Sequence, residues 1–397
     1  MADFSPAGRL EGVRSSRIRA VLDKARAMER AGRPVISFSV GEPDFDTPQP
    51  IKDGTCQALL ANRTHYCSNR GVLELRQAVA GLMKSSSGLS YDPEEEILIT
   101  TGGAEALHHA LWAFVGPGDE VIILTPAFIS YENVVRLCGA RPVLVPCRPE
   151  NGFQPDLDEV ARHVTVRTRM IVVNNPCNPS GAVFPQELLA GLARLAERHN
   201  LLVLSDEIYN RLIYGGSAFC SMAGLPGMRE RTLLVNGFSK TYAMTGWRVG
   251  YVSAPKELVS SMVKVHQYTT ASGNTFVQEG LARGLADPAT ETAVRAMLQS
   301  FARRRELVVS GLQKISGLTF VRPQGAFYAL VSTEGTGLSG EWFAADLLER
   351  CGVAVVPAGD FGPGLENFFR LSFAASESAI VRGLEKIRGF VESIARR

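Results

Sequence analysis

Four apolar runs in the middle of the chain each end in residues that could do chemistry. The segments that follow the runs are Gly102-Gly103-Ala104, Asn174–Asn178, Ser205-Asp206 and Ser239-Lys240. If the runs are strands of one parallel sheet, their carboxyl ends meet at one edge, where such sheets bind their ligands. A phosphate-holding turn, an amide, a carboxylate and an amine would then form a single site.

Each of these segments also has a plainer interpretation. Gly102-Gly103 before a helix offers free N–H groups to a phosphate, or it is an ordinary tight turn. Asp206 fits a residue with a charged partner, because a carboxylate among apolar residues is costly alone, or it fits a helix N-cap. Lys240 fits an amine of lowered pKa that forms an imine with a carbonyl, or a solvated loop lysine. Taken singly, the segments leave both interpretations open.

Two arginines lie in otherwise apolar surroundings. Within Asn367–Phe373, the alternation of a strand puts three apolar residues on one face and Arg370 on the other. A guanidinium in such a strand is suited to clamp a carboxylate through two hydrogen bonds, and it fits a structural ion pair equally well. Arg248, in Gly246–Gly250, has the same two interpretations.

The runs that must position these residues predict one large α/β sheet. The expected strands are Ile97–Thr100, Val121–Leu124, Pro142–Val145, Met170–Val173, Leu201–Leu204, Thr232–Val235 and Arg248–Val252. Between them, apolar residues at helical spacing predict helices, for example over Ala104–Val115 and Gln186–His199. Runs that are apolar on both faces and alternate with helices indicate a mostly parallel seven-stranded sheet covered by helices.

The last third of the chain predicts a smaller α+β domain. A helix-like stretch, Pro288–Ile315, precedes three alternating segments set among glycine and proline: Leu318–Arg322, Ala326–Val331 and Phe368–Phe373. We expect residues 1–45 to form an N-terminal arm and part of this small domain. Residues 46–285 are expected to form the large, cofactor-binding domain, and residues 286–397 the small C-terminal domain.

The composition excludes several classes of protein. Hydrophobic residues at 45% and charged residues at 21% are typical of globular chains. A net charge of +2 is too small for a nucleic-acid surface, and no apolar run approaches the roughly 20 residues of a membrane span. Seven scattered cysteines and an N-terminus without an apolar signal region predict a reducing, cytoplasmic location. The histidines form no i, i+4 pair, and His108 and His109 would point to different helix faces, so no metal site is expected.

Taken together, these segments resemble those of the class I aminotransferases, the pyridoxal-phosphate enzymes of the aspartate aminotransferase fold type. The resemblance extends from about Ser15 to the C-terminal helix. The motifs that carry it are Gly41–Pro48, Asn178–Gly181, Ser205–Tyr209 and Ser239–Arg248, in this order. The resemblance implies pyridoxal 5′-phosphate as cofactor and transfer of an amino group from an L-amino acid to a 2-oxo acid.

The resemblance also implies catalytic roles, by matching position. Lys240 matches the lysine that holds the cofactor as an internal aldimine and, once released, moves a proton between the substrate and the cofactor, which becomes its pyridoxamine form. Asp206 matches the partner of the pyridine N–H, whose charge keeps the ring an electron sink. Tyr209 and Asn178 match the hydrogen-bond partners of the ring oxygen O3′.

The phosphate and the subunit arrangement are implied in the same way. The residues matched to the phosphate are Gly103 and Ala104 through their N–H groups, Arg248 as charge partner, and Ser239. Tyr66 matches a tyrosine that reaches the phosphate of the neighbouring subunit. The active unit is therefore expected to be a homodimer with shared active sites.

The substrate is the least constrained part of the resemblance. The residues matched to the substrate α-carboxylate are Arg370, Gly41 and Asn178. Phe128 stands where the family usually has Trp or Tyr over the cofactor ring. Ala104 stands where bacterial aspartate-type relatives have a lysine for an acidic side chain. With Ile18 as an apolar wall, a neutral or aromatic amino donor is favoured over aspartate.

Three other functions compete with this one. Another pyridoxal-phosphate reaction, by a lyase or a biosynthetic enzyme acting on an unusual amino acid, needs the same lysine, aspartate and arginine. A non-catalytic relative would be expected to lack Lys240, Asp206 or Arg370, and all three are present. A nucleotide-binding dehydrogenase is disfavoured, because no Gly-x-Gly-x-x-Gly follows a predicted strand.

Overall fold

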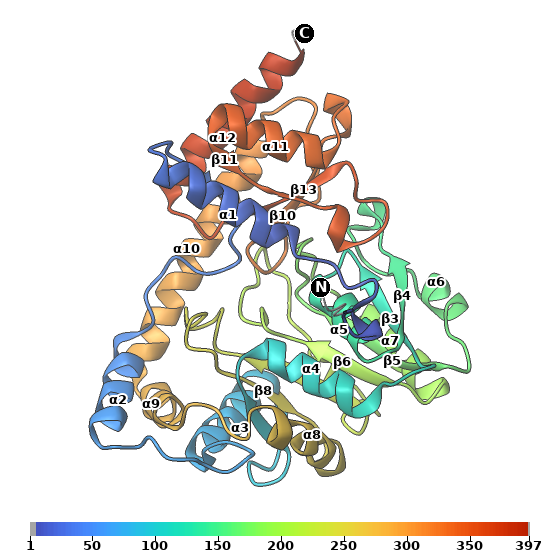
Figure 1. The fold of residues 1–397 in the computed structure, drawn as a ribbon, viewed down its shortest axis with the longest axis vertical. Helices are drawn as coiled ribbons and strands as arrows, with labels where there is room; N and C mark the ends of the chain where they lie inside the picture. Colours follow the sequence, from blue (N-terminus) through green and yellow to red (C-terminus); the bar gives the residue numbers. More distant parts are fainter. Residues whose placement is uncertain (1–4, 396–397) are drawn as a thin grey trace.

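A seven-stranded sheet in the lower part of the molecule positions the candidate site (Figure 1). The computed structural model describes residues 5–395. The first four residues of the predicted arm, in the region where no signal segment is expected, lie outside the described residues. The strands are β2 (Ile97–Thr100), β3 (Glu120–Thr125), β4 (Arg141–Pro146), β5 (Thr168–Asn174), β6 (Leu202–Asp206), β7 (Thr232–Gly237) and β8 (Gly250–Ser253). Their order is β2-β8-β7-β6-β5-β3-β4; β8 is antiparallel to both neighbours, and the other pairs are parallel. The predicted mostly parallel α/β sheet is confirmed.

Helices cover both faces of this sheet, which explains why its strands are apolar on both sides. In β3, Val121 and Ile123 pack in one cluster with residues of α4 and α8, whereas Ile122 and Leu124 pack in another with residues of α7. The helices are α1 (Arg17–Arg30), α2 (Gln49–Leu60), α3 (Leu73–Ser87), α4 (Gly103–Phe114), α5 (Ser130–Leu137), α6 (Leu157–Arg162), α7 (Gln186–Arg198), α8 (Lys256–Thr269), α9 (Thr275–Leu285), α10 (Pro288–Leu312), α11 (Gly340–Cys351) and α12 (Glu377–Ala395). No helix among residues 5–395 is long and apolar enough to cross a membrane.

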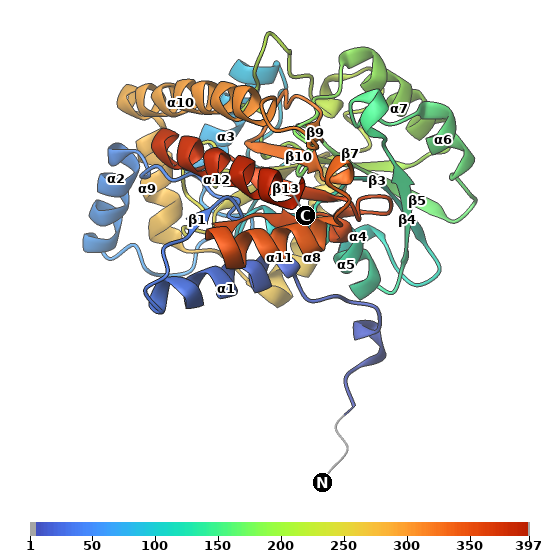
Figure 2. The same ribbon diagram turned by 90° about the horizontal axis from the view of Figure 1, so that it is seen from above.

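The upper part of the molecule is a smaller α+β unit. Its antiparallel sheet has the order β12 (Val356–Pro357), β13 (Phe368–Ser372), β10 (Tyr328–Ser332) and β9 (Thr319–Phe320). The N-terminal stretch lies with this unit, because β1 (Ile36–Ser37) pairs in parallel with β11 (Val353–Ala354) and α1 lies beside α11 (Figure 2). The domain limits at residues 45 and 285 stay predictions.

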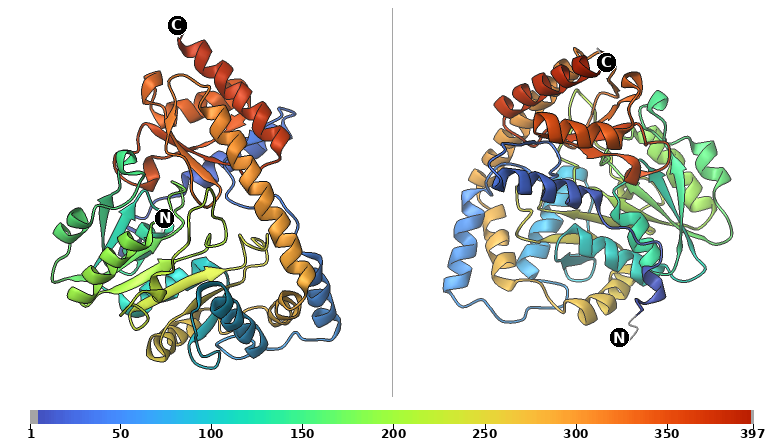
Figure 3. Two further views of the ribbon diagram at one scale, coloured as in Figure 1. Left: turned by 180° about the vertical axis from the view of Figure 1, so that it is seen from behind. Right: turned by 45° about the horizontal axis from the view of Figure 1, so that its top comes forward.

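The long helix α10 connects the two parts of the molecule. It begins at Pro288 because Asp287 accepts a hydrogen bond from the N–H of Ala289 at 2.8 Å, and proline is favoured at the first helical position. It contacts α2 and α9 below and α12 above, and α12 packs along it on the outside (Figure 3).

Backbone conformation or limited pairing shortens three of the predicted strands. The sequence predicts a strand from Arg248, but β8 begins at Gly250, because Arg248 has a φ of 57°, outside the extended region. Ala326 has a φ of 55°, so β10 begins only at Tyr328. Only two residues of the predicted Leu318–Arg322, those of β9, pair with β10.

Candidate active site

A cavity of about 580 Å³ at the carboxyl ends of β5, β6 and β7 brings most of the predicted residues together. The predicted residues that line it are Ile18, Gly41, Gly103, Ala104, Phe128, Asn178, Asp206, Tyr209, Ser239, Lys240, Arg248 and Arg370. Tyr66 does not line it; its side chain is 90% exposed in the loop between α2 and α3. The cavity therefore collects residues from both the lower sheet and the upper unit.

Lys240 follows β7 and places its amine inside the cavity. Its Nζ donates a hydrogen bond to the carbonyl oxygen of Gly41 at 2.6 Å. Burial lowers the pKa of Lys240 to about 8, despite the opposing charge of Glu42. An amine with this pKa is partly uncharged near neutral pH and can attack a carbonyl carbon. The side chain is thus unlike a solvated loop lysine.

Asp206 is the last residue of β6, and its carboxylate is almost fully buried. Tyr131 donates its hydroxyl proton to Oδ2 at 2.7 Å, and the N–H of Ile208 donates to Oδ1 at 3.2 Å. Burial raises the pKa of Asp206, and these two hydrogen bonds oppose that rise. The residues after Asp206 form a turn and no helix, so the N-cap alternative is wrong. A cationic group opposite this carboxylate would favour its charged form.

The turn between β2 and α4 is shaped to hold an anion. Gly102 has a φ of 80°, and a Cβ there would lie 2.6 Å from Nη2 of Arg248. The first-turn N–H groups of Gly103 and Ala104 have no acceptor within the helix, at its positive end. Two features position the guanidinium of Arg248 beside this turn. The backbone of Arg248 is left-handed, and its Nη1 donates a 2.9 Å hydrogen bond to the Thr245 carbonyl.

Arg370, on β13, is a buried cation whose hydrogen-bond partners among the described residues are all uncharged. Its Nη1 donates to Oδ1 of Asn178, and its Nη2 donates to the carbonyl of Ser39, both at 3.0 Å. Its Nε is buried and has no hydrogen-bond partner in the described part of the chain. Within residues 5–395 it forms no ion pair with a carboxylate, so a structural salt bridge does not explain it. Burial lowers the pKa of Arg370, because a charge held away from water is unfavourable.

Several cavity residues were not predicted from the sequence. Tyr131 holds Asp206, and Asn174 both donates to the Asp206 carbonyl at 3.1 Å and accepts the N–H of Asn178 at 2.8 Å. Tyr328 places its hydroxyl 2.9 Å from that of Tyr209. Of these, Asn174 alone had a sequence signal, since it directly follows the predicted strand Met170–Val173. Tyr131 and Tyr328 contact the site from α5 and β10, and no local sequence pattern predicts these contacts.

A second group of titratable residues joins α4 to α8. Glu105, His109 and His266 bring their side-chain atoms within 4.8 Å of one another, with Nε2 of His109 3.1 Å from Nδ1 of His266. Burial lowers the pKa of both histidines. The outer ring nitrogens of both have no hydrogen-bond partner, whereas histidine ligands of metals normally donate from that nitrogen. The group is therefore best described as a packing contact next to the turn between β2 and α4.

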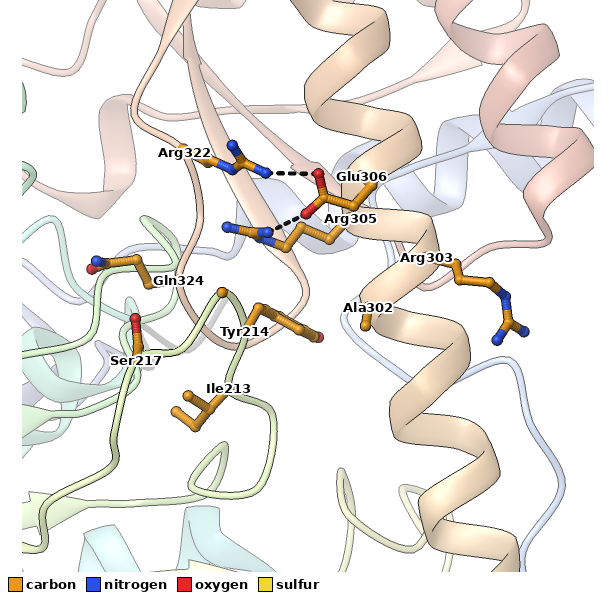
Figure 4. A pocket seen from close by; sticks show the side chains of 10 residues that line it. Ile213, Tyr214, Ser217, Ala302, Arg303, Arg305, Glu306, Arg322 and Gln324 are labelled. Atoms are coloured by element: carbon orange, nitrogen blue, oxygen red, sulfur yellow. Dashed lines mark hydrogen bonds and ion pairs between the residues drawn. The ribbon is translucent and has the colours of Figure 1, made fainter.

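A larger cavity, of about 730 Å³, lies elsewhere, between α10 and the loop after Tyr209 (Figure 4). Its charges are already paired, because Glu306 bridges Arg305 and Arg322. Arg303 points away from it and bonds to Glu377. No predicted site residue lines this cavity.

Comparison with known proteins defines the class of this protein. The sequence profile of the aminotransferase class I and II family matches residues 33–387. The chain is 41% identical to the aspartate aminotransferase of Pyrococcus abyssi and 40% identical to aromatic-amino-acid aminotransferase 2 of Thermococcus litoralis, each over 96% of both chains. The structure of the Thermus thermophilus aspartate aminotransferase with maleate has a TM-score of 0.93 at 40% identity, covering 98% of this chain and 100% of that one. The chain therefore belongs to the class I and II aminotransferases, enzymes that transfer amino groups.

Proposed function

We propose that this aminotransferase uses pyridoxal 5′-phosphate to move the amino group of a neutral or aromatic L-amino acid to a 2-oxo acid. The observation that carries the proposal is the meeting, in one cavity, of an amine with a pKa of about 8, a buried carboxylate and an unneutralised guanidinium. These are the three groups that the reaction needs. Lys240 would attach the cofactor, Asp206 would face its ring nitrogen, and Arg370 would bind the substrate α-carboxylate.

The cavity fits the remaining parts of the cofactor as well. The N–H groups of Gly103 and Ala104, with Arg248 against the Gly102 turn, suit a phosphate. Ser239 lines the same cavity. Residues suited to the ring are Tyr209 and Asn178 for its oxygen and Phe128 for its face. When bound, the cofactor supplies an electron sink for the carbanion at the substrate Cα.

Within this site, the chain's own residues orient the substrate and move its proton. The guanidinium of Arg370 holds the α-carboxylate, with its position fixed by Asn178 and Ser39. Lys240, once its nitrogen is free, takes the proton from Cα and returns it to the cofactor side. Asp206 keeps its negative charge because the group it faces is cationic.

The walls of the cavity support the preference for a neutral or aromatic donor. Ala104 offers no cation next to the turn between β2 and α4, and Phe128, Ile18 and Leu22 add apolar surface. The cations Arg19 and Arg26 also line the cavity, on the α1 side. The names of the relatives include both aspartate and aromatic aminotransferases, so the family accommodates either kind of side chain. Phenylalanine and leucine are accordingly expected to react faster than aspartate.

We also propose that the active form is a homodimer. Tyr66 is 90% exposed, and two further large apolar side chains, Tyr268 and Leu60, are 86% and 83% exposed. Aromatic residues such as Tyr66 and Tyr268 are enriched at contact surfaces between chains. Tyr66 would contribute to the phosphate site of the partner.

The experiment that tests the proposed function is a half-reaction without an acceptor. Purified protein mixed with phenylalanine alone should lose its visible absorbance band and release one 2-oxo acid per site. Lys240→Ala should show neither change. Release of ammonia over many turnovers would instead show a lyase and contradict the proposal.

A further inference from the structure

Tyr328 is a buried cavity residue to which the proposed function assigns no task. It is the first residue of β10, it is 1% exposed, and its hydroxyl lies 2.9 Å from that of Tyr209. A Cβ on Gly41 would lie only 2.5 Å from the same hydroxyl. The hydroxyl of Tyr328 is therefore enclosed between Tyr209 and the residue that accepts the hydrogen bond of Lys240.

The ring of Tyr328 contacts Arg370. In the antiparallel pair of β10 and β13, Tyr328 is opposite Ser372 and Leu330 is opposite Arg370, so Tyr328 and Arg370 are diagonal neighbours on one face. Cζ of Arg370 lies 4.5 Å from the centroid of the Tyr328 ring and 5.3 Å from that of Phe361. Such cation–π contacts stabilise a buried guanidinium and restrict its plane.

Counting protons fixes the direction of the hydrogen bond between the tyrosines. Each phenol has one proton to donate. If Tyr209 donates its proton to the cofactor ring oxygen, it has no second proton for Tyr328. The hydrogen bond between the two hydroxyls must then use the proton of Tyr328. Burial raises the pKa of both hydroxyls, so both keep their protons at neutral pH. Tyr328 then donates to Tyr209, and Tyr209 donates to the cofactor.

We propose that Tyr328 is a positioning residue with two separable actions: its hydroxyl aims the proton of Tyr209 at the cofactor, and its ring holds Arg370 for the substrate carboxylate. This inference rests on the proposed function. It makes one side chain on β10 the link between the carboxylate site and the cofactor site.

The action of the hydroxyl is tested by titrating the absorbance of the holoenzyme with pH, without substrate. The hydrogen bond that Tyr209 donates to the cofactor ring oxygen stabilises the negative charge on that oxygen. This stabilisation is strongest when the Lys240 nitrogen carries no proton, so the hydrogen bond lowers the pKa of that nitrogen. Tyr328→Phe removes the hydroxyl and keeps the ring. It should raise this pKa by about 0.5–1, as expected for the loss of one neutral hydrogen bond.

The action of the ring is tested with 3-phenylpropionate, a carboxylate without an amino group. Its affinity for the holoenzyme is measured by calorimetry. Tyr328→Phe should bind it within about twofold of the parent, because the ring remains. Tyr328→Leu should bind it about five- to tenfold more weakly, because a cation–π contact is lost. Equal affinity in the Leu variant would overturn the action of the ring.

Two further variants separate these actions from general effects on the core. Tyr214 is a matched control: its buried hydroxyl donates to the Ala326 carbonyl at 2.7 Å, Cζ of Arg305 lies 5.6 Å from its ring, and it lines the cavity of Figure 4 and not the active site. Tyr214→Phe should leave the titration unchanged. The double variant Tyr209→Phe/Tyr328→Phe should titrate as Tyr209→Phe alone, because Tyr328 acts through Tyr209.

The outcomes distinguish this inference from the function on which it rests. A Tyr328→Phe titration equal to that of the parent, or additive effects in the double variant, would overturn the action of the hydroxyl. A parent protein without any pH-sensitive visible band would instead overturn the proposed function. The Phe variant keeps the buried ring, so the test of the hydroxyl does not depend on whether the Leu variant folds.

Discussion

Lys240 and Arg370 share one physical property, which is a positive charge held away from water. Neither forms an ion pair with a carboxylate in the part of the chain that the structure describes, and burial lowers the pKa of both. The consequence differs, because lysine can lose its proton near neutral pH and arginine cannot. We therefore expect Lys240 to act as a nucleophile and Arg370 to remain a cation suited to bind a carboxylate.

The pKa of Lys240 predicts how cofactor attachment depends on pH. The uncharged amine is the reactive form, so the attachment rate to apo-protein should rise about tenfold per pH unit below 8 and level off above it. Stopped-flow absorbance after mixing with pyridoxal 5′-phosphate measures this rate. A rate that continues to rise up to the ordinary lysine pKa would show that burial does not activate Lys240.

Replacement of Arg370 by lysine tests the carboxylate clamp. A lysine keeps the charge but loses the planar fork, so kcat/KM for amino acids should fall about 10- to 100-fold in Arg370→Lys. The loss should be much smaller for 2-phenylethylamine, which has no carboxylate. Arg305→Lys, at a buried arginine outside the active-site cavity, should leave the ratio of the two substrates unchanged. Equal losses of kcat/KM for both substrates would mean that Arg370 stabilises the fold and does not bind the carboxylate.

At the scale of elements, the site depends on the residues that come directly after the strands. The ends of β5, β6 and β7 supply Asn174, Asp206 and the segment to Lys240, while the turn after β2 supplies the start of α4. A side chain at Gly102 would have to displace the guanidinium of Arg248 and adopt a strained φ of 80°. The close approach of the Gly102 turn to the guanidinium of Arg248 thus shapes the candidate anion-binding turn.

This close approach predicts the effect of a methyl group in the turn. Gly102→Ala should displace Arg248 and weaken binding of pyridoxal 5′-phosphate to the apo-protein about 10- to 100-fold, as for the loss of a charge-assisted hydrogen bond. Cofactor titration followed by protein fluorescence measures the affinity. Gly118→Ala is the control, since Gly118 has a similar φ of 91° with no atom within 4 Å of its Cβ. Similar losses in both variants would point to backbone strain alone.

At the scale of the whole molecule, the cavity lies where the lower sheet meets the upper unit. Ile18 and Arg370 reach it from the upper unit, and Asp206 and Lys240 reach it from the sheet. Tyr66 is the predicted site residue that this arrangement leaves outside the cavity. A second copy of the chain is the natural way to bring such a residue to a phosphate site.

The shared site predicts complementation between two inactive variants. Tyr66→Ala and Lys240→Ala should each have low activity alone. In a mixed dimer, one site would contain both changes and the other site would contain neither. Mixing the two variants after mild dissociation should therefore restore up to about half of the parental activity per mixed dimer. Activity that stays at the average of the two variants would show that Tyr66 serves its own subunit.

Much of the fold and site could be predicted because their signals are local. The seven strands are confirmed, since a strand buried on both faces must be apolar along its length. Lys240 and Asp206 could be placed together, since strand ends of a parallel sheet share one edge. Arg370 was recognisable as the odd residue in an apolar strand.

Tertiary contacts decided the features that no local pattern could. Whether Asp206 caps a helix or faces a cavity depends on the turn after it and on Tyr131, which arrives from α5. Whether Arg370 has a counter-ion depends on every element around β13. Tyr328 meets Tyr209 and Arg370 through the register of β10 on β13. The periodicity of apolar residues predicts that a side chain is buried, because burial depends on the face of a single strand or helix. The partners of that side chain depend on strand order and register, which only the folded chain defines.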